Sequence, residues 1–177
     1  MKTALIIVDV QNDFLPGGAL GVPDGDKVIE PLIEAAAEAD LIVASRDWHP
    51  KNHCSFTDAG GQWPQHCVAD TEGAEIHSFI ADLADVIVSK ATETDRDAYS
   101  AFDGTELAAL LKKAGVERVL IGGLATDYCV KATTLDALRA GFQTTVLVNA
   151  SAAVNVNEGD GGQAVMDMRH AGAQVVH

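Results

Sequence analysis

Residues 118–141 have the sequence Arg-Val-Leu-Ile-Gly-Gly-Leu-Ala-Thr-Asp-Tyr-Cys-Val-Lys-Ala-Thr-Thr-Leu-Asp-Ala-Leu-Arg-Ala-Gly, and this stretch decides the fold. The apolar run Val119–Ile121 predicts a buried parallel strand, which two glycines interrupt. The helical spacing of the apolar residues beyond it predicts a helix that begins at Thr126 or Asp127. Cys129 is therefore expected in the first turn of a helix, at the carboxyl end of a strand, where open α/β sheets place their ligands.

The position of Cys129 favours a chemical role for its thiol. Unpaired N–H groups at a helix start attract negative charge, so we expect a lowered thiol pKa and a nucleophilic sulfur. The alternative for a single cysteine is a small apolar side chain within the core. The neighbouring glycines, the helix start and the polar residues at other strand ends favour the nucleophile.

The rest of the chain alternates predicted strands with predicted helices. Further strands are expected at residues 3–9, 41–45, 86–89 and 144–149, with a short edge strand at 173–176. Helices are expected at about residues 26–39, 104–114 and 158–171. This alternation predicts one domain over residues 1–177, with a three-layer α/β/α architecture and a doubly wound, mostly parallel sheet of about six strands.

Three polar side chains follow three of these strands and form a candidate catalytic set. Asp9 can accept a proton from Cys129, and Lys90 can keep that carboxyl ionised or stabilise developing negative charge. Singly, Asp9 could cap a turn and Lys90 could be a solvated cation. Together the acid, the cation and the nucleophile suffice for acyl transfer.

A second set of residues has the chemistry of a metal site. Asp47 and His49 lie two apart after a predicted strand, so both side chains can point to one side, and His66 can return from the long loop. Two imidazoles and one carboxylate suit one divalent ion, Zn, Fe or Mn. His53 is a further candidate ligand. The alternative is that Asp47 and His49 only hydrogen-bond loop backbone.

Aromatic residues in the loops form a candidate ring pocket. Phe14, Trp63 and Tyr99 all follow strand ends and can wall a site for a flat aromatic ring. The alternative is that they anchor their own loops. The stretch from Pro50 to about Ser78 lacks periodicity, and a loop of that length in a compact domain is usually functional or disordered.

Composition narrows the classes of partner. The chain has 177 residues and a formal net charge of -14, which argues against nucleic acid and anionic membrane surfaces as partners. No apolar run approaches the ~20 residues of a membrane span, and the N-terminus has no signal-peptide pattern. We expect a cytoplasmic protein with three reduced cysteines, a small-molecule substrate, and either a monomeric or a homo-oligomeric state.

These motifs together resemble those of bacterial nicotinamidases, also called pyrazinamidases, within the isochorismatase-like cysteine hydrolases. The matching segments cover nearly the whole chain: Ile6–Phe14, Asp47–Pro50, His53–Phe56, Trp63–Val68, Lys90, Asp97–Phe102 and Gly123–Val130. The nucleophile segment is typical of the superfamily. The Asp-Trp-His-Pro and Trp-Pro-x-His-Cys segments are typical of the nicotinamidase branch.

The resemblance implies an isochorismatase-like fold and assigns roles to residues of this chain. It implies a catalytic triad of Asp9, Lys90 and Cys129, a metal held by Asp47, His49 and His66, and ring contacts from Phe14, Trp63 and Tyr99. It also implies a cis peptide between Leu124 and Ala125, both beside the substrate, and an oxyanion hole formed by the N–H groups of Ala125 and Cys129.

The activity that the resemblance implies is hydrolysis of nicotinamide to nicotinate and ammonia in NAD salvage, with pyrazinamide converted to pyrazinoate. An alternative is another isochorismatase-like hydrolase that acts on a different small amide or on a vinyl ether. A catalytically silent binding module of the same fold would be expected to lack one of Asp9, Lys90 and Cys129, and all three are present.

Overall fold

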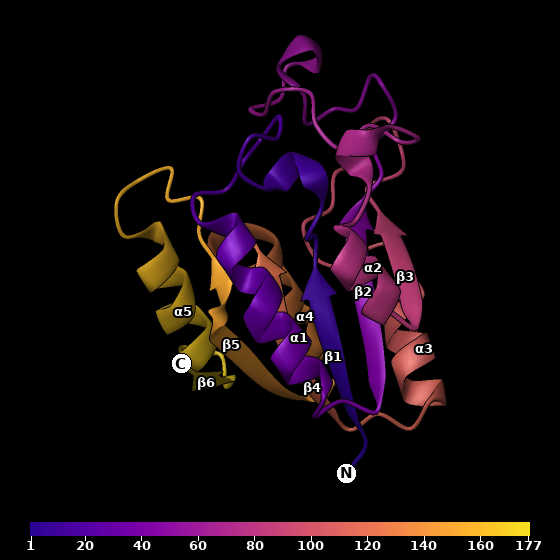
Figure 1. Cartoon of the computed structure of the whole chain (residues 1–177), viewed down its shortest axis with the longest axis vertical. Coiled ribbons are helices and arrows are strands. Elements are labelled where there is room, and N and C mark those ends of the chain that lie inside the picture. Colours follow the sequence, from indigo (N-terminus) through magenta and orange to yellow (C-terminus); the bar gives the residue numbers. More distant parts are fainter.

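The computed structural model describes residues 1–177 as a parallel sheet between two layers of helices (Figure 1). The six strands are β1 (Thr3–Val8), β2 (Leu41–Asp47), β3 (Val86–Lys90), β4 (Arg118–Leu124), β5 (Gln143–Ala152) and β6 (Gln174–Val176). They lie in the order β3-β2-β1-β4-β5-β6, and every pair is parallel. The predicted doubly wound sheet is confirmed, and the strand order reverses between β1 and β4, where such sheets open a crevice.

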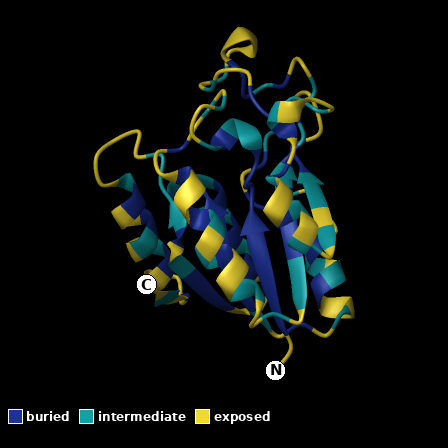
Figure 2. Cartoon of the chain, viewed as in Figure 1, coloured by how far each residue is buried: buried dark blue, intermediate teal, exposed yellow.

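Helices cover both faces of the sheet. Helices α1 (Ile29–Ala36) and α2 (Ser78–Leu83) lie on one face, and α3 (Leu107–Lys113), α4 (Lys131–Arg139) and α5 (Asp160–His170) lie on the other. Strand β1 is buried along its whole length (Figure 2). Its alternate side chains belong to the two cores on opposite faces of the sheet. None of the helices has the length and apolar character needed to cross a membrane.

The helices differ from the prediction at their ends. The helix expected at 26–39 begins as a 3-10 turn, Gly25–Val28, and its α-helical part ends at Ala36. Helix α2 was not expected, because it has only six residues and buries only Ile80, too little to give a periodic pattern. The helix after β4 opens with a π-helical turn, Thr126–Val130, before α4 begins.

The long segment between β2 and α2 lies over the carboxyl edge of the sheet (Figure 1). It contains two short 3-10 turns, Thr57–Ala59 and Glu72–Ala74. The carboxylate of Asp13, in the loop after β1, accepts a hydrogen bond of 2.8 Å from the N–H of Cys67. This bond fastens the segment above the crevice.

A glycine at the end of β4 permits the close approach of β1. Gly123 has φ +120°, and a Cβ at this position would lie 2.2 Å from the carbonyl oxygen of Val8. Only glycine fits this conformation and this spacing. The carboxyl ends of β1 and β4, which carry Asp9 and the turn that contains Cys129, are therefore held side by side.

Candidate active site

Three elements bring Asp9, Lys90 and Cys129 together in a buried cluster. Asp9 follows β1, Lys90 ends β3, and Cys129 lies in the turn after β4. The Lys90 Nζ atom lies 2.9 Å from Oδ2 of Asp9 and 3.6 Å from the Cys129 sulfur. A carboxylate oxygen of Asp9 and the sulfur lie within 4.8 Å of each other. The structure thus places a proton acceptor, a cation and a thiol in mutual contact.

The environment of Asp9 makes its carboxylate more basic than usual. Burial raises the pKa of Asp9, the charge of Lys90 opposes that rise, and the nearby Asp47 carboxylate adds to it. The hydroxyl of Ser45 donates a hydrogen bond of 2.7 Å to Oδ1, which fixes the orientation of the carboxylate. The other oxygen, Oδ2, faces Lys90.

Lys90 remains an ammonium ion in this cluster. Its Nζ atom contacts carboxylates of both Asp9 and Asp47 and donates a hydrogen bond of 3.1 Å to the carbonyl of Ala98. Burial opposes the charge, but the two carboxylates raise the pKa of Lys90 well above its usual value. One cation therefore compensates two buried carboxylates.

The expected lowering of the Cys129 pKa is wrong. Burial raises the pKa of the thiol well above its usual value, the charge of Lys90 opposes this rise, and the carboxylates of Asp9 and Asp47 add to it. Cys129 also lies within a π-helical turn rather than in the first turn of an α-helix. The raised pKa favours the protonated thiol, and the carboxylate of Asp9 lies close enough to be a candidate acceptor for its proton.

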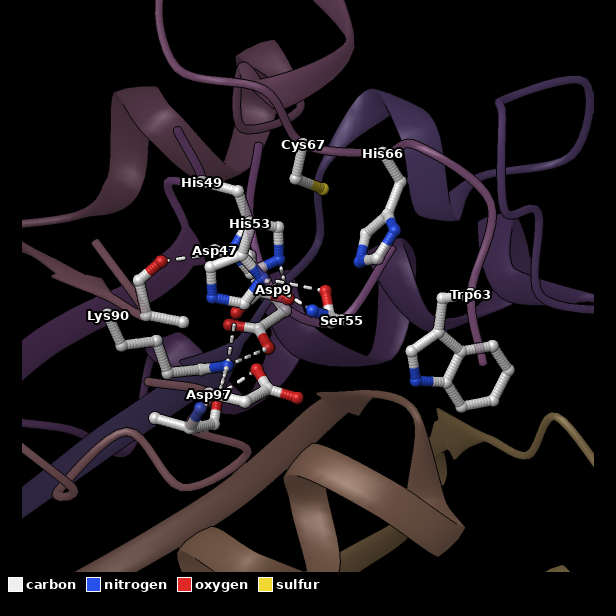
Figure 3. Close-up of polar contacts among 12 residues, drawn as sticks. Asp9, Asp47, His49, His53, Ser55, Trp63, His66, Cys67, Lys90 and Asp97 are labelled. Atoms are coloured by element: carbon white, nitrogen blue, oxygen red, sulfur yellow. Dashed lines mark hydrogen bonds and ion pairs between the residues drawn. The ribbon is translucent and has the colours of Figure 1, made fainter. Parts of the chain in front are cut away.

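A second cluster, next to the first, has the geometry of a metal site (Figure 3). Ligand atoms of Asp47, His49 and His66 lie within 4.8 Å of one another, and all three residues are buried. Nδ1 of His49 donates to the carbonyl of Ala91 at 3.0 Å, and Nδ1 of His66 donates to the carbonyl of Pro64 at 2.7 Å. Nε2 of each ring therefore faces the cluster, that of His49 at 3.5 Å from Oδ2 of Asp47, and the donor set fits a divalent ion.

His53 lies beside this cluster but is engaged elsewhere. Its ring stacks on that of His49 with centroids 4.0 Å apart. Nε2 donates to the carbonyl of Arg96 at 3.1 Å, and Nδ1 accepts from the hydroxyl of Ser55 at 2.7 Å. Both ring nitrogens of His53 therefore have hydrogen-bond partners within the protein, and its ring packs against that of His49.

Gln11 holds Asp47 in place, a role that the sequence analysis missed. Its amide oxygen accepts from the N–H of Asp47, and its amide nitrogen donates to the carbonyl oxygens of Asp47 and Ala74, each at 2.8 Å. Gln11 is fully buried. The sequence did offer a signal for this role: Gln11 is a polar amide that follows an apolar strand directly, two residues after Asp9.

Both clusters border one pocket, to which Asp47, His49, His66 and Cys129 contribute and whose lining is mostly hydrophobic. The predicted residues Phe14, Trp63, Tyr99, Leu124 and Ala125 all line it. Six further lining residues were not predicted to face it: Leu20, Val22, Ser55, Asp97, Tyr128 and Val154. They lie in loops or at a turn, where no periodic pattern marks a side chain as facing a cavity.

The backbone beside Cys129 offers a hydrogen-bond donor to the pocket. The peptide between Leu124 and Ala125 is cis, as the resemblance implied. The N–H of Ala125 makes no hydrogen bond within the protein, although the residue is 6% exposed. This unpaired N–H lies next to the turn that contains Cys129 and can donate a hydrogen bond to a ligand oxygen.

Comparisons with known proteins agree with this geometry. The Isochorismatase domain family matches residues 3–177. The chain is 38% identical to a nicotinamidase from Escherichia coli over 196 aligned residues, which cover 96% of this chain and 92% of that protein.

Two solved structures are similar to this chain in fold and in sequence. A pyrazinamidase of Pyrococcus horikoshii in complex with zinc has a TM-score of 0.93 and 49% identity, covering 100% of this chain and 99% of that one. PnC1 from L. infantum in complex with nicotinate also has a TM-score of 0.93, with 35% identity and coverage of 99% and 92%.

Proposed function

The chain belongs to the isochorismatase family, and from this membership and the site we propose that it hydrolyses nicotinamide to nicotinate and ammonia. Pyrazinamide is the second substrate, and the reaction serves NAD salvage, as the family implies. The observation that carries the proposal is the meeting of Asp9, Lys90 and Cys129 beside a pocket lined by aromatic side chains. The nicotinamidase relative supports the choice of substrate.

In the first half-reaction, Asp9 takes the proton of the Cys129 thiol, and the sulfur attacks the amide carbon. The negative charge that develops on the amide oxygen is stabilised by the N–H groups of Ala125 and Cys129. Removing one such donor typically costs about 3 kcal/mol of barrier stabilisation. Lys90 stays protonated and keeps the Asp9 carboxyl ionised for its role as base.

The first half-reaction ends when the carbon–nitrogen bond breaks: Asp9 returns the proton to the leaving nitrogen, ammonia departs, and a thioester to Cys129 remains. Hydrolysis of this thioester is the second half-reaction. Asp9 then takes a proton from water, and the resulting hydroxide attacks the thioester carbon. The carbon–sulfur bond breaks, the sulfur regains a proton from Asp9, and the new carboxylic acid loses its proton to solvent and leaves as nicotinate. The thiol and the carboxylate are thereby restored.

For the metal, we propose that Asp47, His49 and His66 hold one zinc ion, with iron or manganese as alternatives of similar ligand preference. The zinc complex of the P. horikoshii pyrazinamidase supports this choice. A bound divalent ion supplies a Lewis acid beside the ring pocket. Phe14, Trp63 and Tyr99 orient the ring so that its amide faces Cys129.

We also propose that the protein acts in the cytoplasm on this small molecule, as a monomer or homo-oligomer, without a nucleic-acid or membrane partner. The net charge of -14 supports the exclusion of polyanionic partners, because like charges repel.

The test is release of ammonia from nicotinamide by the purified protein, measured before and after treatment with a chelator. We expect turnover that the chelator lowers and that added zinc restores. The Cys129→Ala variant should release no ammonia while still binding nicotinamide in a calorimetric titration, and Cys54→Ala, which changes a thiol outside the cluster, should behave as wild type. Residual turnover by Cys129→Ala would refute the nucleophile.

A further inference from the structure

The carboxylate of Asp127 joins one wall of the pocket to the π-helical turn Thr126–Val130, which contains Cys129. Asp127 lies two residues before Cys129 in the π-helical turn. Its Oδ1 accepts the N–H of Val154 at 2.9 Å, and its Oδ2 accepts the N–H of Asn155 at 2.8 Å. Both carboxylate oxygens are thus bonded to the segment that follows β5, and Val154 of that segment lines the pocket.

The same segment is fastened at its other end to α5. Asn155 adopts φ +53°, and its side-chain oxygen accepts the N–H of Gly161, in the first turn of α5, at 2.8 Å. A Cβ on Gly161 would lie 2.6 Å from that of Ala153, so the segment and the helix are in close contact. The segment has no regular secondary structure, so these side-chain bonds set its position.

We propose that Asp127 is a positioning residue that fixes the Val154 wall and thereby restricts the pocket to amides carried on a single six-membered ring. This inference rests on the proposed amide hydrolysis. Because Asp127 contacts the wall through backbone N–H groups, its loss should move the whole wall rather than one side chain. Ring binding and substrate size preference should respond, whereas the cluster around Cys129 keeps its own contacts with Asp9 and Lys90.

The experiment compares nicotinamide with a two-ring amide, quinoline-3-carboxamide, in wild type and in Asp127→Asn. Asparagine keeps one acceptor oxygen but turns an NH₂ group toward the second N–H, so at least one bond is lost. We expect the KM for nicotinamide to rise about tenfold while kcat changes less than about twofold. The ratio of kcat/KM for the two-ring amide to that for nicotinamide should rise about tenfold.

Three further variants and one control make the test specific. Val154→Ala removes the wall side chain directly and should raise the ratio of kcat/KM values in the same way as Asp127→Asn. The double variant Asp127→Asn/Val154→Ala should raise this ratio by less than the product of the two single increases. Asn155→Gly suits the positive φ but removes the bond to α5, so it should shift the ratio in the same direction. The control is Asp136→Asn on α4, which makes the same acid-to-amide change away from the wall and should match wild type.

Alkylation of Cys129 by iodoacetamide separates a wall effect from damage to the nucleophile. An unchanged alkylation rate in Asp127→Asn is expected. A fall in kcat at constant KM, or an unaltered size ratio in all three wall variants, would overturn the proposal even if wild type hydrolyses nicotinamide normally. Absence of wild-type turnover would instead overturn the proposed function. Should Asp127→Asn fail to fold, Val154→Ala and Asn155→Gly still decide the matter.

Discussion

At the scale of single residues, Asp47 connects the two halves of the site. Its Oδ1 contacts the ammonium of Lys90, and its Oδ2 lies 3.5 Å from Nε2 of His49. Burial opposes ionisation, but Lys90 and His49 together hold the pKa of this carboxyl well below its usual range. Lys90 in turn contacts Asp9. This one cation therefore connects Asp47, a proposed metal ligand, to Asp9, the proposed base.

The raised pKa of Asp9 predicts where activity falls in acid. The carboxylate must be unprotonated to take the proton of Cys129, so kcat/KM should fall as the pH drops below the pKa of Asp9. Burial raises that pKa, and the acid limb should therefore lie above the value of about 3.9 for an ordinary aspartate. Toward alkaline pH the raised pKa of Lys90 should preserve activity.

A pH–rate profile of kcat/KM with nicotinamide, on protein loaded with zinc at each pH, measures this limb. Far-ultraviolet circular dichroism at each pH is the control for unfolding. An acid limb at or below that of an exposed aspartate would contradict the assignment of buried Asp9 as the base.

Lys90 should also matter for stability. Lys90→Met removes the one cation between the buried carboxylates of Asp9 and Asp47, and breaking such a buried pair typically costs about 3–5 kcal/mol of unfolding free energy. Urea unfolding measures the loss. The matched control is Lys131→Met, whose ion pair with Asp167 is half-exposed and should contribute far less. Equal losses in the two variants would show that Lys90 has no special structural role.

At the scale of elements, the site depends on the backbone conformation at the carboxyl ends of β1, β3 and β4. Asp9 adopts φ +50° directly after β1, and Ala91 adopts φ +50° directly after β3. In both cases the backbone leaves the extended conformation at the edge of the sheet and the chain turns away. The side chains of Asp9 and Lys90 remain at that edge, in the buried cluster. Strand β4 ends in the same place with Gly123 at φ +120° and leads into the π-helical turn.

The end of β4 yields a prediction about glycines. Gly123→Ala should destabilise the protein by more than about 3 kcal/mol, because its Cβ would overlap the backbone of Val8 and the residue would be held at a positive φ. Gly162→Ala, in α5 with open space around it, should instead stabilise by about 0.5–1 kcal/mol. Chemical unfolding of both variants tests the pair. A tolerated Gly123→Ala would mean that β1 and β4 can separate at this edge.

At the scale of the whole molecule, the reversal of strand order brings together segments far apart in the sequence. Strands β1 and β4 are separated by more than a hundred residues along the chain, yet they pair along their full length. The long segment after β2 then covers the crevice and contributes Trp63 and His66 to the pocket (Figure 1). The pocket therefore exists only when the sheet and the covering segment are both in place.

Metal binding should stabilise this assembly as a whole, because the proposed ligands come from both β2 and the covering segment. An ion that binds only the folded chain adds about 2.7 kcal/mol at a concentration one hundred times its Kd. We expect zinc to raise the Tm of chelator-treated protein. His49→Ala should abolish this rise, whereas His170→Ala on α5 should retain it. An equal rise in both variants would place the ion elsewhere.

The sequence by itself determined the sheet, the strand ends and the residue types in the site. Apolar runs and the polar residues that follow them are local features, and parallel strands necessarily bring their carboxyl ends to one edge. The fold prediction was confirmed for this reason. The grouping of Asp9, Lys90 and Cys129 could be anticipated in the same way, and their roles remain proposals.

Only the tertiary structure decided the properties that depend on burial and on contacts between distant segments. The thiol of Cys129 has a raised pKa because desolvation outweighs Lys90, and no local pattern reports that balance. Likewise, His53 is bonded to Arg96 and Ser55, Gln11 clamps Asp47, and Asp127 holds Val154, each through a partner that spacing alone does not identify. Hydrogen bonds and electric fields act through space, so these features emerged only when the chain was folded.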